Sequence, residues 1–380
     1  MSIVKWTTNK LEVSHGQNNP LLSMEGLRGM AVFLVFWAHY SSQITPWLSG
    51  HSIQIANFIH DLGVIGVDLF FVLSGYLIYG MIITKKRFLL VEYVNRRVRR
   101  IYPTFIAVLS VYLILSFLLP SESKLPEQSG ELIKYVLYNI MLLPGIFDIK
   151  PIMTVAWSLS YEVFSYISIP CIILSLNMKN WHAKYRIYFW ALFSLLGFYV
   201  CVDYQEYSRL MMFASGIVLF ELHNNLKLRI SQGGIFCLFL ALIIFGFKSV
   251  LGFNYLLSLM ALYVLFLLMC LCAFNDTTTT YQVFSFSPLR WLGNMSYSYY
   301  LLHGLTLKFS FFVIGHLFGH TIENAYLYYW LWIPLFLLSL IASFVLFVVI
   351  EKPLSLTIKA KKENQIQNTT LSLPPQKQLS

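Results

Sequence analysis

Charged residues are scarce in this sequence. Asp, Glu, Lys and Arg make up 12% of its 380 residues, whereas 57% are hydrophobic and the mean hydropathy is +0.65. Soluble domains carry about 25% charged residues, roughly twice that share. The scarcity of charge excludes an ordinary soluble domain and indicates a polytopic membrane protein.

Several other features are missing. The apolar runs do not alternate with polar residues, which argues against a transmembrane barrel and for helices. Residues 1–20 are polar and no small-residue cleavage site follows the first apolar run, so we expect no cleavable signal peptide. The five cysteines lie in apolar runs without metal-ligand spacing, so we expect packing residues and no metal site. Without a Gly/Ser linker or an internal repeat, we predict one membrane domain over 1–355 and a polar, disordered cytoplasmic tail over 356–380.

Ten apolar runs are long enough to cross a bilayer core of about 30 Å. They lie at 26–44, 61–83, 101–119, 153–176, 187–202, 208–223, 233–248, 254–273, 294–315 and 327–350. A further run at 132–147 is shorter, contains Lys134 and Asn139, and ends in Pro144-Gly145. The predicted fold is therefore all-α, with about ten transmembrane helices.

The 27 Lys and Arg residues decide how the run 132–147 is placed. If it does not cross, both termini lie on one side, and 21 basic residues fall on that side against 6 on the other. If it crosses, the later loops exchange sides and the split becomes 14 to 13. Because cytoplasmic loops carry the excess of Lys and Arg, we expect an external re-entrant or surface helix near 132–147 and cytoplasmic termini. The net charge of +10 then reflects membrane orientation rather than nucleic-acid binding.

The first apolar run contains two ionisable residues, Arg28 and His39. They are eleven residues apart, almost three helical turns, so their side chains share one face with an axial separation of about 16 Å. Ionisable groups inside a membrane indicate a functional site. We therefore expect Arg28 at the cytoplasmic edge of a site whose centre is His39.

Three more titratable residues, Asp68, Glu162 and His303, are predicted at the same mid-membrane depth. Each has a simpler explanation: Asp68 could cap an irregular helix segment, Glu162 with Ser158 could join helices, and His303 beside Tyr300 could be a packing histidine. Since unpaired charges are costly to bury, one shared polar cavity accounts for all of them together.

The most basic stretch, KKRFLLVEYVNRRVRRIYP, lies between the second and third runs. One interpretation is that it fixes the topology by binding anionic lipid. The other is a cytosolic phosphate-binding patch, since guanidinium groups can hold a polyphosphate, here those of Arg96, Arg97, Arg99 and Arg100. The two interpretations are compatible.

Six motifs follow one another along the chain: GLRGMAVFLVFWAH, GVDLFFVLSGYLI, EYVNRRVRRIYP, AWSLSYEVFSY, GNMSYSYYLLH and VIEKP. Together they resemble the membrane acyltransferase-3 family, bacterial enzymes that O-acylate extracytoplasmic glycans. The resemblance implies acyl-CoA, usually acetyl-CoA, as cytosolic donor and a sugar hydroxyl as acceptor. Val163 departs from the pattern, because many members have a second polar residue there, and this leaves the acceptor open. Some members carry an extra hydrolase-like domain; here about 30 residues follow the last run, so we expect the membrane domain to complete the transfer.

The resemblance also implies roles for residues. Arg28 and His39 match the essential pair of the family, and Glu162 belongs to its Ser-Leu-Ser-x-Glu element, so the resemblance implies that these three residues are catalytic. We expect His39 to activate the acceptor hydroxyl, and Arg28 to hold the coenzyme phosphates or to stabilise charge at the carbonyl. The donor-binding residues are then Arg28, Arg96, Arg97, Arg99 and Arg100, and the residues that bind the acceptor or orient His39 are Asp68, Ser158, Ser160, Tyr300 and His303.

The predicted function is that of a bacterial inner-membrane O-acetyltransferase, with acetyl-CoA as substrate and no permanently bound cofactor. Its predicted partners are membrane lipids and a glycan or lipid-linked glycan, such as the lipopolysaccharide O-antigen. The alternative is a transporter or flippase of a lipid-linked sugar. Such proteins often contain internal repeats or broken helix pairs, and neither is evident in this sequence.

Overall fold

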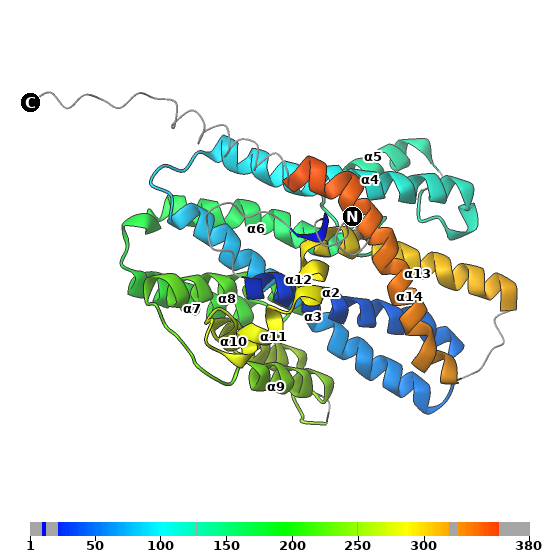
Figure 1. Cartoon of the computed structure of the whole chain (residues 1–380). Helices are drawn as coiled ribbons and strands as arrows, with labels where there is room; N and C mark the ends of the chain where they lie inside the picture. The colour runs from blue at the N-terminus through cyan, green and yellow to red at the C-terminus, as the bar shows by residue number, and fades with distance from the viewer. Residues whose placement is uncertain (1–9, 13–21, 127, 249, 319–324, 357–380) are drawn as a thin grey trace, which may run out of the picture.

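The protein is built from helices. The computed structural model describes residues 10–12, 22–126, 128–248, 250–318 and 325–356, and all regular elements in these ranges are helical (Figure 1). The α-helices are α2 (Leu22–Ile44), α3 (His51–Ile83), α4 (Leu90–Leu118), α5 (Ser129–Ile140), α6 (Ala156–Ser175), α7 (Ala183–Val200), α8 (Met211–Phe220), α9 (Gly234–Gly246), α10 (Tyr255–Ala273), α11 (Thr279–Phe284), α12 (Ser287–Asn294), α13 (Ser296–Phe318) and α14 (Ala325–Leu346), which continues as the π-helix η6 (Phe347–Leu356).

Six of these helical segments are long and apolar enough to cross a membrane. They are α3, α4, α6, α10, the part of α13 at Ser296–Leu317, and Tyr328–Leu356, which joins α14 to η6. The predicted class, an all-α multi-pass membrane protein, is thereby confirmed. Each of the ten predicted apolar runs overlaps one of the helices, although α3 and α4 begin ten or more residues before the predicted runs. The tail predicted over 356–380 lies, apart from Leu356, outside the described residues.

Helices α2, α3 and α8 pack closely because glycines line their contacts. A Cβ atom at Gly66 of α3 would lie 2.5 Å from the carbonyl oxygen of Ala31 in α2. On the other side of α3, a Cβ at Gly216 of α8 would lie 2.0 Å from the carbonyl oxygen of Val72. Small residues permit such backbone approach between membrane helices, so α3 becomes the centre of the bundle.

We expect Gly216→Ala to destabilise the folded protein, because the added methyl group has no space and must push α8 away from α3. Overpacking of this kind costs about 1–3 kcal/mol. The measurement is the thermal unfolding midpoint of the purified protein in detergent. Gly130→Ala in α5 is the matched control, since a Cβ there meets nothing within 4 Å and the midpoint should not fall. An unchanged midpoint for Gly216→Ala would contradict the close packing of α3 and α8.

Helix α4 begins well before its apolar part. The basic stretch predicted as a connection between the second and third runs is helical from Leu90 onward. On a helix, residues three or four positions apart share a face, so Tyr93, Arg97 and Arg100 face one way. Arg97 and Arg100 are half-buried, whereas Arg96 and Arg99 are exposed. Because Arg96 is also four positions from Arg100, burial rather than helical spacing divides the four arginines into two pairs.

The segment near 132–147 is a short helix followed by a turn. Helix α5 has 12 residues and therefore rises about 18 Å, too little to cross the bilayer core. The turn contains a bridge between Pro144 and Phe147, and Gly145 has the positive φ of 94° that favours glycine. The Asn139 side chain accepts a hydrogen bond from the backbone N–H of Ile152 at 2.8 Å, which ties α5 to the chain before α6.

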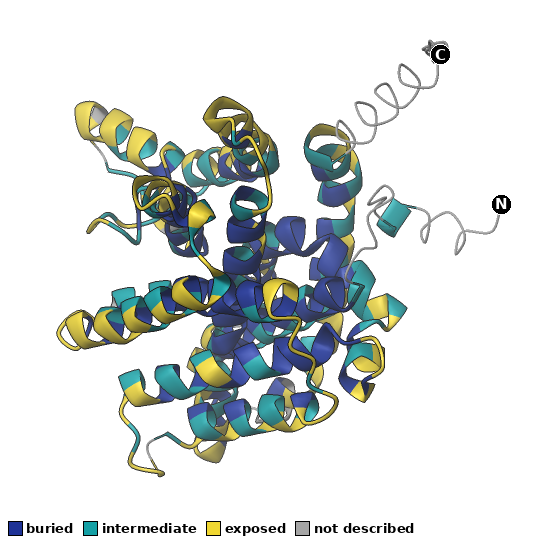
Figure 2. Ribbon diagram, turned by 90° about the vertical axis from the view of Figure 1, so that its left-hand side faces the viewer, coloured by how far each residue is buried: buried dark blue, intermediate teal, exposed yellow. Residues whose placement is uncertain are grey.

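Burial is concentrated where the helices meet, and exposed residues line the outward surfaces of the bundle (Figure 2). Many exposed side chains are large and apolar. On α7, for example, Leu192, Leu195, Leu196 and Tyr199 are each more than half exposed. A surface of this kind suits lipid rather than water.

Candidate active site

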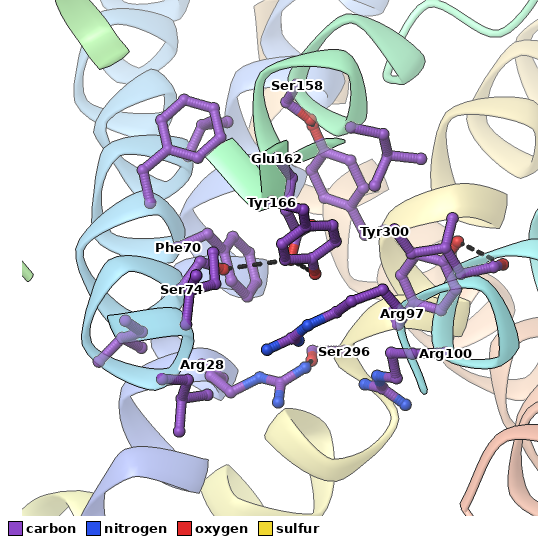
Figure 3. Close-up of a pocket in the computed structure, with 18 residues that line it drawn as sticks. Arg28, Phe70, Ser74, Arg97, Arg100, Ser158, Glu162, Tyr166, Ser296 and Tyr300 are labelled. Carbon is purple, nitrogen blue, oxygen red and sulfur yellow. Dashed lines mark hydrogen bonds between the residues drawn. The ribbon is translucent and has the colours of Figure 1, made fainter. Parts of the chain in front are cut away.

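Three arginines converge on a cavity of about 120 Å³ in the bundle. Its charged lining residues are Arg28 of α2, Arg97 and Arg100 of α4, and Glu162 of α6, and we call it the arginine cavity (Figure 3). Three guanidinium groups against one carboxylate give the described lining an excess of positive charge. The cavity is therefore suited to an anionic group.

Arg28 is held by the start of α13. Its Nη2 donates a hydrogen bond to the hydroxyl of Ser296 at 2.9 Å. The Arg28 side chain is partly buried and lines the arginine cavity.

Arg100 is held by Glu351 of η6. Its Nη1 donates to the Glu351 carboxylate at 2.7 Å, and the carboxylate also accepts from the backbone N–H and the hydroxyl of Ser298, at 3.0 and 2.6 Å. Glu351 is completely buried. Sequence reasoning recorded the VIEKP motif but gave Glu351 no role. The sequence does contain a signal for Glu351: it is an acidic residue at the end of an apolar run, on the side of the membrane predicted for the basic cluster.

Arg97 and Glu162 both contact Tyr166. The guanidinium carbon of Arg97 lies 4.5 Å from the centre of the Tyr166 ring, a cation–π contact. The Tyr166 hydroxyl donates to the Glu162 carboxylate, which also accepts from the Ser74 hydroxyl at 3.3 Å. Figure 3 shows these side chains around one space. Neither Ser74 nor Tyr166 was predicted from the sequence.

The other two predicted arginines lie elsewhere. Arg96 is exposed and forms an ion pair with Glu92, 2.8 Å away and one turn earlier on α4. Arg99 is also exposed, and neither residue lines the arginine cavity. Exposed ion pairs on a helix surface contribute little energy. The structure thus brings together Arg28, Arg97 and Arg100, but not Arg96 or Arg99.

A second, larger cavity of about 660 Å³ contains His39, and we call it the histidine chamber. The ring of His39 lies 5.0 Å from the ring of His303, measured between centroids. His303 is completely buried, and its Nδ1 donates to the carbonyl oxygen of Tyr299 at 2.9 Å. In the neutral ring, Nε2 then carries the lone pair, and among the described residues this atom has no hydrogen-bond partner. His303 thus lies beside His39, and its Nε2 can accept a hydrogen bond.

The two cavities meet at Val67 and Tyr300, which line both of them. The Tyr300 hydroxyl and the Ser158 hydroxyl are 2.6 Å apart, and Ser158 also donates to the carbonyl oxygen of Val155 at 3.1 Å. Tyr300 is thereby fixed at the boundary. The predicted residues Ser158 and Tyr300 stand between the arginine cavity and the histidine chamber.

Asp68 does not line either cavity; it forms an ion pair with Arg209 at 3.2 Å and is completely buried. Arg209 does line the histidine chamber, and its Nε donates to the Tyr255 hydroxyl at 2.7 Å. Arg209 was not predicted as a site residue, because its pairing with Asp68 depends on the packing of distant helices. Ser160 donates to the carbonyl oxygen of Ala156 in its own helix, at 3.3 Å, and lines neither cavity.

Fold and cavities together define a multi-pass helical membrane protein with a two-chambered polar site. A family described as acyltransferase domain matches residues 21–352, and the chain therefore belongs to the acyltransferase-3 family.

Curated relatives share about half their length with this chain. A Staphylococcus aureus (strain COL) protein with a provisional O-acetyltransferase name is 26% identical over 336 residues, covering 77% of this chain and 52% of the relative. O-acetyltransferase OatA of Staphylococcus aureus (strain NCTC 8325 / PS 47) is 24% identical over 339 residues, covering 78% and 52%. An uncharacterized protein of Haemophilus influenzae is 33% identical over 119 residues, covering 28% and 48%. No solved structure matches.

Proposed function

We propose that this protein is a membrane O-acetyltransferase that moves an acetyl group from cytosolic acetyl-CoA to a hydroxyl of an extracytoplasmic glycan. The observation that carries the proposal is the meeting of the arginine cavity and the histidine chamber at Val67 and Tyr300. A donor and an acceptor can approach this boundary from opposite sides. The family, and the names of its O-acetyltransferase members, support transfer over transport.

The proposed orientation has ten spans, both termini in the cytoplasm, and α5 at the outer face. The excess of Lys and Arg in alternate connections supports it. With this orientation the arginine cavity opens toward the cytosol, where acyl-CoA is made. The membrane is then the bacterial inner membrane.

The three arginines are proposed to bind the phosphates of acetyl-CoA. Guanidinium groups form paired, charge-assisted hydrogen bonds with phosphate oxygens. Glu351 and Ser296 hold Arg100 and Arg28 in place before the donor arrives, and this preorganisation lowers the cost of binding. Arg96 and Arg99, outside the cavity, would act on anionic lipid rather than on the donor.

His39 is proposed as the general base. It takes the proton from the acceptor hydroxyl while the oxygen attacks the thioester carbonyl carbon, the carbon–sulfur bond breaks, and the proton passes to the coenzyme thiolate. His303 would orient the His39 ring through Nε2. Glu162, in the arginine cavity, would position the donor through Ser74 and Tyr166.

The histidine chamber is proposed to receive the sugar. Its lining combines the aromatic rings of Trp157, Tyr161 and Tyr255 with the polar groups of His39 and Arg209. Apolar ring faces with a few fixed polar groups suit a pyranose, which has both kinds of surface. The acceptor class is thus a surface polysaccharide, such as the lipopolysaccharide O-antigen.

The proposal is tested by deleting the gene and measuring ester-linked acetyl groups on the surface glycan by mass spectrometry. We expect the acetyl groups to disappear and to return with a plasmid copy. In parallel, purified protein should bind acetyl-CoA and release its thiol slowly in the absence of acceptor. Unchanged glycan acetylation together with no acetyl-CoA binding would refute the proposed function.

A further inference from the structure

Two lysines lie beside the histidine chamber. Lys124, in the connection after α4, and Lys308 of α13 line a pocket of about 220 Å³ that also contains His39, which we call the lysine pocket. Both side chains are exposed, and the Lys124 ammonium donates a hydrogen bond to the Thr154 hydroxyl at 3.3 Å. Partial desolvation, and then the charge of Lys308, lower the pKa of Lys124. Like charges that interact in this way repel each other, and an anion at the pocket would reduce the repulsion. Phosphate is an anion that lysine commonly binds.

An apolar groove continues from the lysine pocket toward the lipid. It lies between α4 and α13, and the two cavities share Tyr112, Ser116 and Lys308. Near the other end of α4 the helices are joined by a hydrogen bond of 2.8 Å from the Tyr297 hydroxyl to the carbonyl oxygen of Ile101. The remaining lining residues of the groove are Leu115, Leu119, Leu305, Phe309 and Phe312.

The side of the groove faces outward from the bundle. Phe309 is 53% exposed, and exposed apolar side chains on these helices face lipid. A hydrocarbon chain could therefore enter the groove sideways from the membrane without crossing polar surface. The groove, the lysine pocket and the histidine chamber form a series, since the pocket also shares His39, Gln43 and Thr154 with the chamber.

Gly304 supports the use of this series as a path. It lies within α13, where glycine costs roughly 0.5–1 kcal/mol relative to alanine. A Cβ atom at Gly304 would meet nothing closer than Val155 at 3.9 Å and Tyr112 at 4.0 Å, whereas at Gly216 it would be 2.0 Å from backbone. Close helix packing does not explain Gly304. It lines the lysine pocket and leaves that pocket open.

We propose that the acceptor reaches His39 as a lipid-linked glycan that enters between α4 and α13. Its apolar tail would lie in the groove, its phosphate or diphosphate between Lys124 and Lys308, and its sugar in the histidine chamber. This inference rests on the proposed function and specifies its acceptor. An ordinary phospholipid could supply the tail and the phosphate, but it has no sugar that would fill the histidine chamber.

The test measures binding of undecaprenyl diphosphate to the purified protein in nanodiscs. We expect the double variant Lys124→Gln, Lys308→Gln to bind about tenfold more weakly, and Lys124→Arg, Lys308→Arg to bind as the wild type does. Inorganic diphosphate should compete poorly, because it lacks the tail. Equal binding by the glutamine variant would overturn the proposal. So would equal displacement of the probe by phosphatidylglycerol, which would make the groove a general phospholipid site.

A second variant tests the path itself. Gly304→Leu has space for its Cβ but fills the lysine pocket, so glycan acetylation in cells should fall at least tenfold while acetyl-CoA binding is kept. Unchanged acetylation would remove this pocket from the route. Two further measurements separate the two hypotheses. No acetyl-CoA binding by the wild type together with unchanged glycan acetylation after gene deletion refutes the proposed function, whereas acetyl-CoA binding with lysine-independent lipid binding refutes only the lipid-linked acceptor.

Discussion

His39→Ala is expected to lower acetyl transfer to the glycan by about 10²–10⁴-fold, the usual contribution of a general base. The change removes the only imidazole that both lines the histidine chamber and lies beside His303, among the described residues. The measurement is transfer of labelled acetyl from acetyl-CoA to glycan in membranes with matched protein levels. Donor binding should remain, because His39 does not line the arginine cavity.

His60→Ala is the matched control for His39. His60 also lines the histidine chamber, but its side chain is 39% exposed, and its Nδ1 lies 3.6 Å from Oδ1 of Asp61. We expect less than a threefold change. Retained transfer in His39→Ala, or an equal loss in both variants, would contradict the general-base role of His39.

Arg28→Ala is expected to raise the KM for acetyl-CoA by about 10- to 150-fold, since a hydrogen bond to a charged group contributes about 1.5–3 kcal/mol. The initial rate of thiol release at varied acetyl-CoA concentration measures this. Arg28→Lys should recover part of the affinity, because an ammonium keeps the charge but not the paired geometry. A fall in kcat with an unchanged KM would instead place Arg28 at the reacting carbonyl.

Arg96→Ala is the control for Arg28. Arg96 belongs to the same basic group in the sequence but is exposed and does not line the arginine cavity. The KM for acetyl-CoA should change less than twofold. Because Arg96 also adds to the cytoplasmic positive charge, a reporter fusion must show that the topology of the variant is unchanged. Equal effects of the two substitutions would indicate a diffuse electrostatic role for the arginines.

Apolar runs predicted the helices well, because the requirement to satisfy backbone groups in lipid leaves few other structures. The same periodicity placed Arg28 and His39 on one helix. It could not separate Arg97 and Arg100 from Arg96 and Arg99, because Arg96 and Arg100 are four positions apart and share a helix face. The prediction also placed this basic stretch in a connection, whereas α4 begins at Leu90.

The partners of these residues were beyond sequence reasoning. Glu351 contacts Arg100 across 251 residues of chain, and Arg209 contacts Asp68 from a different helix. Such pairings depend on how the helices pack against one another, which the residue pattern within a single helix does not predict. His303 was predicted at the same depth as His39, but its position directly beside His39 emerged only from the fold.

The ion pair between Asp68 and Arg209 has a consequence for biosynthesis. Arg209 is made 141 residues after Asp68 (209 minus 68), which at usual elongation rates is a delay of roughly 7–28 s. During this time α3 must enter the membrane with an unpaired carboxyl group, at an insertion cost of about 2.5–3.5 kcal/mol. The strongly apolar composition of α3 offsets that cost. The apolar residues of α3 therefore have two roles. They allow α3 to enter the membrane before Arg209 has been synthesised, and they pack against the other helices in the folded protein.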